Sequence, residues 1–539
     1  MQRVNRILAI PALLTPVAIS LLIAVYPLRG SWDDGAITAA YAQTYATTGQ
    51  ISLTPTSTVV EGTSSLLWML LLTVPAHLSR NPDAVLVWMK CLSALSLIGG
   101  LLLVYRFARR QLASDVGALA CTLMVAFSYT SLLEVRNGME MNLCMLLLLL
   151  IAEICTGQNA MGTGNVLLAC GAMLILFATR FESPFLLAFL ILGICMDRFR
   201  VHASGWWHDP ALLTTASIFS FGVIELWRWH HFGVWMPNTV YAKEWAPYSR
   251  WHDHQSVSAI LLASVPALME VLPVAGISVL ISLIAILSSR TGGRSPREHP
   301  KVSAVVRTLA GATLPLAWIT GHDWGYAGRM LIPLLPFLFL AAIALCMSLP
   351  RMAARRAIAF MIAAQALVWA AVAPNVRMAF VNIENCRQEA LGLDSIRVAL
   401  GFETLTAMIP DVGGSSLYGK NLRIIDSAML SDPQLAHGGW ASFAANFRQA
   451  QPDIFETHRL WASYQHAYDT GLLDDYSIVT SHGFRFFVRN DLYAKLIASN
   501  VGAVIKVDAS PGCLGGIFGI PADRDFSMSK GTCMTLTGR

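Results

Sequence analysis

Apolar stretches recur along the chain from Arg6 to about Ala373 and largely stop beyond it. A helix needs about 20 mostly apolar residues to cross the hydrocarbon core of a bilayer, where no water is present to satisfy exposed backbone groups. The composition agrees: 55% of the 539 residues are hydrophobic and only 13% are charged, whereas soluble domains contain roughly 25% charged residues. The sequence therefore predicts a polytopic α-helical membrane protein.

Three basic loops orient the predicted spans, because Lys and Arg are enriched on the cytoplasmic side. The loops at 106–110, 290–301 and 351–356 all become cytoplasmic, together with the N-terminus, only if the segment 63–78 does not cross. We therefore predict that this segment is an interfacial or re-entrant helix on the outer side. About eleven segments then cross, at 7–28, 84–105, 114–131, 141–155, 164–179, 184–197, 210–227, a stretch ending near Ser289, 303–320, 331–349 and 357–373.

The last third of the chain has a different pattern. Alternating apolar and polar residues in SIVTSHGFRFFV and GAVIKVD are typical of strands, and SFAANFRQAQ is typical of a helix. We predict a transmembrane catalytic domain at 1–374 and an extracytoplasmic α/β domain at 375–539, the latter outside because the number of spans is odd. Whether Cys513 and Cys533 form a disulfide in this domain is left open.

The predicted outer loops contain most of the unusual polar side chains, whereas the cytoplasmic loops are basic or featureless. Ionisable groups at a membrane boundary usually face an internal cavity and mark a functional site. We therefore expect these side chains to converge. They are Asp33, Asp34, Glu61, Arg136, Glu140, Asn142, Arg180, Glu182, Asn238, Tyr241, Lys243, His322, Asp323, Tyr326 and Arg329.

This mixture of charges suits the transfer of a group from a lipid phosphate to a hydroxyl. A carboxylate can remove the proton of the alcohol, and Arg and Lys can hold the phosphate while it leaves. Asp33 and Asp34 raise the proton affinity of one another. One of them can serve as a base while the other orients an acceptor or binds a metal. Either could instead cap the helix that follows.

Several short motifs occur in order along the chain. They are WDDGAITAAYAQTY at 32–45, VEGTSSLLW at 60–68, NGMEM at 137–141, TRFES at 179–183, PNTVYAK at 237–243 and GHDW with GRMLIP at 321–333. In the C-terminal part, DVGG at 411–414 belongs to the same pattern. Together they resemble the GT-C fold glycosyltransferases, in particular the group that includes the mycobacterial arabinofuranosyltransferase B and the bacterial pilin arabinosyltransferases.

The resemblance implies an inverting transferase of the bacterial inner membrane with a polyprenyl-phosphate sugar as donor, best D-arabinofuranose, and an extracytoplasmic glycan or pilin-like protein as acceptor. It implies juxtamembrane helices on the outer side, which fits the segment 63–78. Carried over to this chain, Asp33 is the first choice for the base and Asp34 the second. Arg180, Lys243 and Arg329 would bind the donor phosphate. Sugar and acceptor contacts would come from Glu61, Glu140, Glu182, Asn238, Tyr241, His322 and Asp323.

Other interpretations stay open. Arg180 and Glu182 could form a structural ion pair, and Lys243 and Arg329 could extend to lipid headgroups. A transporter or flippase of a lipid-linked sugar, a non-catalytic assembly factor, and a transferase for mannose or aminoarabinose are the alternative functions. The basic excess lies in short loops, which predicts no nucleic-acid partner. No cofactor is demanded by the sequence, and a divalent cation remains open.

Overall fold

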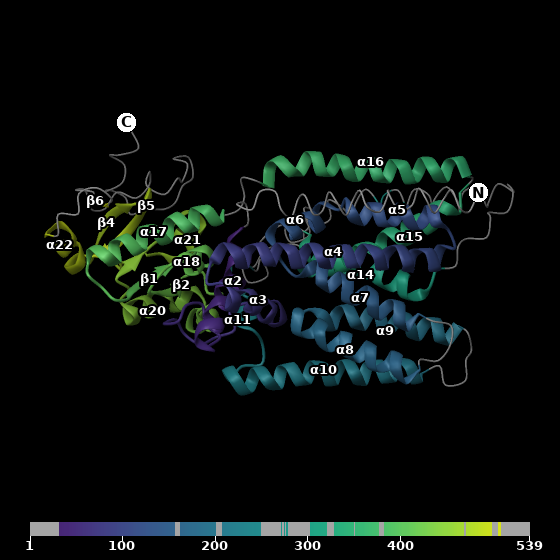
Figure 1. Cartoon of the computed structure of the whole chain (residues 1–539), viewed down its shortest axis with the longest axis horizontal. Coiled ribbons are helices and arrows are strands. Elements are labelled where there is room, and N and C mark those ends of the chain that lie inside the picture. The colour runs from purple at the N-terminus through teal and green to yellow at the C-terminus, as the bar shows by residue number, and fades with distance from the viewer. Residues whose placement is uncertain are drawn as a thin grey trace.

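The computed structural model describes residues 32–156, 162–200, 207–248, 302–320, 328–349, 351–376, 382–467, 470–498 and 505–507, with Val271, Val274, Gly276 and Ser278. It has two parts: a bundle of long helices and a domain with a β-sheet at one end of that bundle (Figure 1). The first predicted span, most of the eighth span, His322, Asp323, Cys513 and Cys533 lie outside the described residues.

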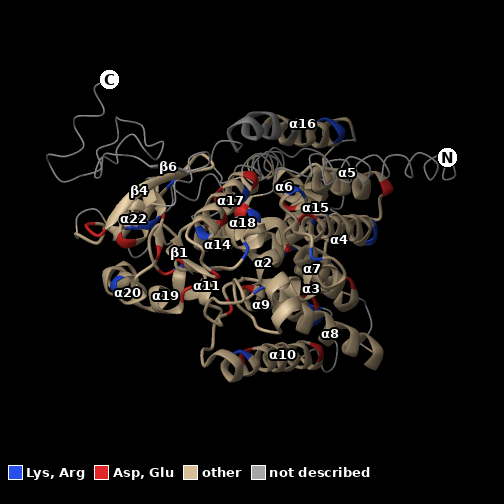
Figure 2. Cartoon of the chain, turned by 60° about the vertical axis from the view of Figure 1, so that its left-hand side comes forward, with Lys and Arg blue, Asp and Glu red and all other residues tan. Residues whose placement is uncertain are grey.

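The bundle is built from the apolar stretches of the sequence. Its helices are α4 (Pro82–Leu112), α5 (Asp115–Ala126), α6 (Tyr129–Asn137), α7 (Met141–Cys155), α8 (Thr163–Thr179), α9 (Ser183–Arg200), α10 (His208–Phe232), α14 (Ala304–Thr320), the 3₁₀ helix η2 (Arg329–Leu334), α15 (Leu335–Met347) and α16 (Arg351–Val376). By length and composition, α4, α10 and η2 with α15 are able to cross a membrane, and so is the bent pair α5 and α6 if it is one span. Charged residues lie at the ends of α4 and α10 (Figure 2).

Short polar side chains start several of these helices. Ser65 accepts a hydrogen bond from the Trp68 amide, and Ser114 accepts one from the Gly117 amide. Such caps satisfy N–H groups that have no partner within the helix. Ser65 begins α3 (Leu66–Leu78), which corresponds to the predicted non-crossing segment and packs beside α2 (Asp33–Thr48) at the end of the bundle nearest the sheet.

The sheet domain mixes parallel and antiparallel strands in the order β2-β1-β3-β5-β4-β6. Its strands are β1 (Leu405–Ile409), β2 (Leu422–Asp426), β3 (Ile454–Phe455), β4 (Tyr476–Ser481), β5 (Phe484–Arg489) and β6 (Ile505–Val507). Its helices are α17 (Ile383–Ala399), α18 (Val412–Tyr418), α19 (Pro433–Gly438), η3 (Trp440–Ser442), α20 (Phe443–Ala450), α21 (Arg459–Gln465) and α22 (Asn490–Ala498). β1 pairs in parallel with β2 and β3, whereas β5 is antiparallel to β3 and β4. The turn His482-Gly483 has φ of 48° and 82°, as a tight hairpin requires.

The two parts share one apolar core where they meet. Ile37 and Trp68 from the bundle side pack in the same cluster as Val412 and Leu417 from α18. Polar contacts reinforce it: Ser57 donates to the Ile424 carbonyl at 2.7 Å. α2, α3 and the short α11 (Asn238–Ala242) lie between bundle and sheet in Figure 1. The sheet domain is therefore packed directly on the segments predicted to be outer loops.

Candidate active site

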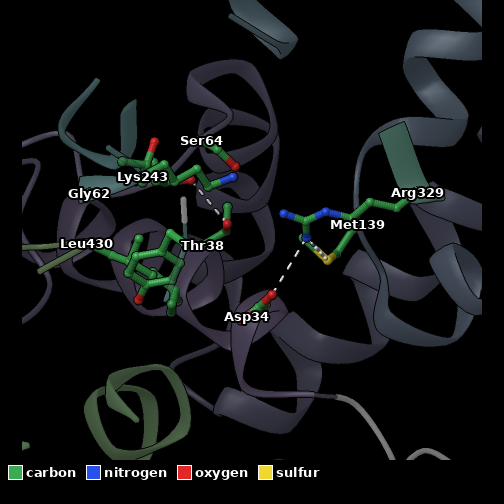
Figure 3. A pocket seen from close by; sticks show the side chains of 12 residues that line it. Asp34, Thr38, Gly62, Ser64, Met139, Lys243, Arg329 and Leu430 are labelled. Atoms are coloured by element: carbon green, nitrogen blue, oxygen red, sulfur yellow. Dashed lines mark hydrogen bonds and ion pairs between the residues drawn. The ribbon is translucent and has the colours of Figure 1, made fainter. Parts of the chain in front are cut away.

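A pocket lies where the outer-loop segments meet the sheet domain (Figure 3). The lining side chains come from α2, from the loop before α3, from the α6–α7 turn, from α11 and its extension, from the start of η2 and from the loop after β2. They are Asp34, Ile37, Thr38, Gly62, Thr63, Ser64, Met139, Thr239, Lys243, Tyr248, Arg329 and Leu430. Three of the predicted site residues, Asp34, Lys243 and Arg329, thus meet in one pocket although they lie far apart in the sequence.

Asp34 and Arg329 face each other across this pocket. The Arg329 Nη1 lies 3.6 Å from the Asp34 Oδ2, and 29% of the Asp34 side chain is exposed against 6% for Arg329. Gly328, with φ of 87°, directs the chain into η2 just before Arg329. A residue with a side chain rarely adopts this conformation. The Lys243 ammonium lies beside Ser64 in the same pocket (Figure 3).

The neighbouring Asp33 has different surroundings. Its Oδ2 accepts a hydrogen bond from the Gly413 amide at 3.0 Å, and its Oδ1 accepts one from the Gly414 amide at 2.6 Å. Burial and the charge of Asp411 raise the pKa of Asp33 to about 7, against the opposing effect of the two amide hydrogen bonds. Asp33 therefore contacts the sheet domain and does not line the pocket, although it was the first choice for the base.

Arg180 lies behind the pocket wall. Its Nη1 donates to Glu140 at 2.8 Å and to the Ser64 hydroxyl at 2.9 Å, and its other two nitrogens donate to Glu182 at 2.9 and 2.7 Å. Only 3% of the side chain is exposed. The structure thus groups Arg180 with two residues predicted to contact the sugar, Glu140 and Glu182, and links all three to the pocket through Ser64.

The remaining predicted residues hold the loops in place. Glu61, 2% exposed, forms a buried ion pair with Arg228 of α10 at 2.6 Å. The Asn238 side chain donates to the carbonyls of Met429 and Leu430 at 3.0 and 2.9 Å.

The Tyr241 ring packs against the His437 ring in a tilted arrangement, with the centroids 4.1 Å apart and an interplanar angle of 37°. None of Glu61, Asn238 and Tyr241 is among the residues that line the pocket.

Sequence reasoning missed several residues that shape this site. Arg228 and Glu225 are charged residues inside an apolar stretch, a signal that could have identified a buried ion pair. Leu430 has no such signal, because an apolar residue in a soluble domain is ordinarily part of the core. Among the described residues, no group of three or more His, Cys, Asp or Glu side chains is arranged to hold a metal ion.

Neither a family model nor a curated protein matches the chain. Solved structures do. A crystal structure of ArnT from Cupriavidus metallidurans bound to undecaprenyl phosphate matches with a TM-score of 0.54 and 14% identity, over 88% of this chain and 97% of ArnT. The apo structure of the same protein matches with a TM-score of 0.54 and 13% identity, over 89% and 98%. The likeness spans both parts of the molecule. The chain therefore has the GT-C fold of ArnT, with a helical bundle and a C-terminal sheet domain, as predicted from its sequence.

Proposed function

We propose that the protein is a multi-pass membrane glycosyltransferase that moves a sugar from a polyprenyl phosphate to an acceptor hydroxyl. The observation that carries the proposal is the meeting of Asp34 with Arg329 and Lys243 in one pocket. A carboxylate and two cations from separate loops are the groups that this reaction needs. The fold supports it, because ArnT with the same fold has been crystallised with undecaprenyl phosphate.

Arg329 and Lys243 bind the donor phosphate in this proposal. The phosphate gains negative charge as its bond to the sugar breaks, so fixed cations stabilise the transition state more than the ground state. Arg329 can offer two parallel N–H donors, whereas Lys243 supplies a point charge. Arg180 is already bonded to Glu140 and Glu182. We therefore assign Arg180 the orientation of Ser64 in place of the predicted phosphate contact.

Asp34 is the base. The acceptor oxygen attacks the anomeric carbon from the side opposite the phosphate, its proton passes to the Asp34 carboxylate, and the polyprenyl phosphate leaves with the bonding electrons. This direct displacement inverts the anomeric centre. Asp34 suits the role because it lines the pocket, whereas both oxygens of Asp33 accept backbone amides of the sheet domain.

The donor sugar is proposed to be D-arabinofuranose, on the resemblance of the sequence motifs, and the acceptor a glycan or a pilin-like protein of the bacterial cell envelope. The pocket combines apolar walls, at Ile37 and Leu430, with the hydroxyls of Thr38 and Ser64. These suit the mixed surface of a sugar. The pocket lies at the end of the bundle opposite the basic segment 106–110 of α4, which supports an extracytoplasmic site in the inner membrane.

The test is a donor panel with the purified full-length protein in lipid nanodiscs. Undecaprenyl phosphate carrying arabinofuranose, mannose or aminoarabinose is incubated with an acceptor glycan, and free undecaprenyl phosphate is measured. We expect release with the arabinofuranose donor and none with the Asp34→Asn protein. If none of the three donors gives release that depends on the acceptor, the proposal is contradicted. Movement of the intact lipid-linked sugar across vesicles would instead support a flippase.

A further inference from the structure

The first turn of α2 and the start of α18 form a joint between the two parts of the molecule. The joint consists of Asp33, Asp411, Gly413, Gly414 and His458. The Asp33 carboxylate, 7% exposed for the whole residue, accepts the Gly413 and Gly414 amides at 3.0 and 2.6 Å. α2 and α18 lie side by side in Figure 1.

Asp33 takes the place of the residue that would ordinarily cap α18. The first amides of a helix have no partner within it, and an Asp at the N-cap position usually accepts one of them. Asp411 is the N-cap residue of α18, but its side chain makes no such bond. The bonds come instead from a residue 380 positions earlier in the chain.

Asp411 is held by a different partner. The His458 Nε2 lies 3.2 Å from the Asp411 Oδ2, and the His458 Nδ1 lies 2.9 Å from the Glu456 Oε1. Glu389, which accepts the Ser415 hydroxyl, also faces this group. Burial disfavours the charged imidazole, but the Glu456 and Asp411 carboxylates outweigh it and hold the pKa of His458 well above its usual value. Asp411 is thus paired with His458, and its side chain makes no cap hydrogen bond to α18.

Both glycines allow α18 to pack closely, Gly413 against α2 and Gly414 against α17. A Cβ on Gly413 would lie 2.2 Å from the Asp33 carbonyl oxygen, and one on Gly414 would lie 2.5 Å from the Cys386 Cβ. Real Cβ atoms do not come this close to other atoms. A side chain on Gly413 would therefore push α18 away from α2, and one on Gly414 would push α18 away from α17.

We propose that Asp33 is a positioning residue through which the C-terminal domain fixes the first turn of α2 and so directs Asp34 into the pocket. The proposal rests on the function assigned to Asp34 above. Adjacent side chains on a helix point about 100° apart. If the bonds of Asp33 fix the rotation of α2 about its axis, they also fix the direction in which the Asp34 side chain points. Ile37 and Thr38, one turn further along α2, also line the pocket.

The experiment compares two neighbouring substitutions, Asp33→Asn and Asp34→Asn, in the full-length protein in nanodiscs. Amide hydrogen exchange is followed in a peptide containing Gly413 and Gly414. We expect Asp33→Asn to speed exchange roughly ten-fold or more, as the loss of a charge-assisted hydrogen bond predicts, and Asp34→Asn to leave it unchanged. Asp33→Asn should also lower kcat but leave the donor KM unchanged, whereas Asp34→Asn should abolish turnover.

A second pair of variants changes the α18 side of the joint and leaves Asp33 intact. Gly413→Ala keeps every carboxylate and should lower kcat in the same way. Gly222→Ala in α10 is the matched control, because a Cβ there would meet no atom within 4 Å. If both act through the joint, the double variant Asp33→Asn with Gly413→Ala should lose no more activity than the worse of the two single variants.

Unchanged exchange in Asp33→Asn would overturn the proposal, and so would a loss of turnover as complete as that of Asp34→Asn, which would make Asp33 the base. A wild-type protein that transfers no sugar would refute the proposed function, while the exchange comparison would still decide whether the joint exists.

Discussion

Two buried arginines at this end of the bundle have different surroundings. Arg180 makes short hydrogen bonds to Glu140 and Glu182 and does not line the pocket. Arg329 lines the pocket, and its ion pair with Asp34 measures 3.6 Å. Arg180 thus belongs to an ion-pair network behind the pocket, whereas Arg329 forms part of the pocket wall. We infer that Arg180 stabilises the site and that Arg329 acts on the substrate.

The largest effect is expected at Asp34, the carboxylate that faces Arg329. Asp34→Asn keeps the size of the side chain but cannot accept the acceptor proton at neutral pH. Turnover should fall by up to about 10⁴-fold, the upper range for a general base. Release of free polyprenyl phosphate measures it. Glu403→Gln, an exposed acid before β1, is the control and should retain full activity. Comparable losses in both proteins would show that Asp34 has no special role.

Arg180→Gln should mainly destabilise the fold. It leaves Glu140, whose side chain is 2% exposed, without its buried partner. Breaking a buried ion pair in this way costs about 3–5 kcal/mol. Thermal unfolding in detergent measures the change. An unfolding temperature equal to that of the wild type, together with weaker donor binding, would show that Arg180 is a phosphate ligand after all.

Arg329→Gln should show the opposite pattern. We expect turnover to fall by about 10²–10³-fold, as for removal of one group that stabilises transition-state charge, while the unfolding temperature changes little. Arg329→Lys should recover part of the loss, because it restores the charge but not the paired donors. A large stability loss with near-normal turnover would remove the contrast between the two arginines.

The smallest effect concerns pH at the joint. Because the pKa of His458 is raised in the folded protein, its contribution to stability is complete below the ordinary value of 6.5 and is lost as the pH rises through the folded value. His458→Gln should therefore lower stability at pH 6, because it removes the cation that the Glu456 and Asp411 carboxylates stabilise in the folded protein. The difference from the wild type should shrink at high pH. Unfolding temperatures at pH 6 and pH 9 measure it, and a difference that grows with pH would contradict the account.

Much of the fold followed from the sequence. The apolar helices of the bundle were predictable because hydrophobic length is a local property, and the short helix at 63–78 was expected as a separate element. The predicted number of eleven spans and their orientation stay predictions. Strand structure was predicted for SIVTSHGFRFFV from its alternation, but the hairpin turn at His482-Gly483 within this stretch was not predicted. The GT-C fold was expected from motifs spread over the whole chain.

The site was predictable only in part. Polar residues of the outer loops were expected to converge, and the structure places Asp34, Lys243 and Arg329 together. The sequence could not show that Asp34 lines the pocket while Asp33 contacts the sheet domain. This difference depends on the Gly413 amide, which lies 380 positions from Asp33. Asn238 was expected to contact substrate from the resemblance of its motif, but its side-chain amide donates to the Met429 and Leu430 carbonyls.

The most direct test of the account is an experimental structure of the protein in nanodiscs with undecaprenyl phosphate. We predict that the phosphate lies in the pocket, within about 3 Å of the Arg329 guanidinium. The Lys243 ammonium should contact the same phosphate, and the Asp34 side chain should lie in the same pocket. A phosphate bound instead by Arg180, or at the opposite end of the bundle near Arg106 and Arg110, would contradict the account.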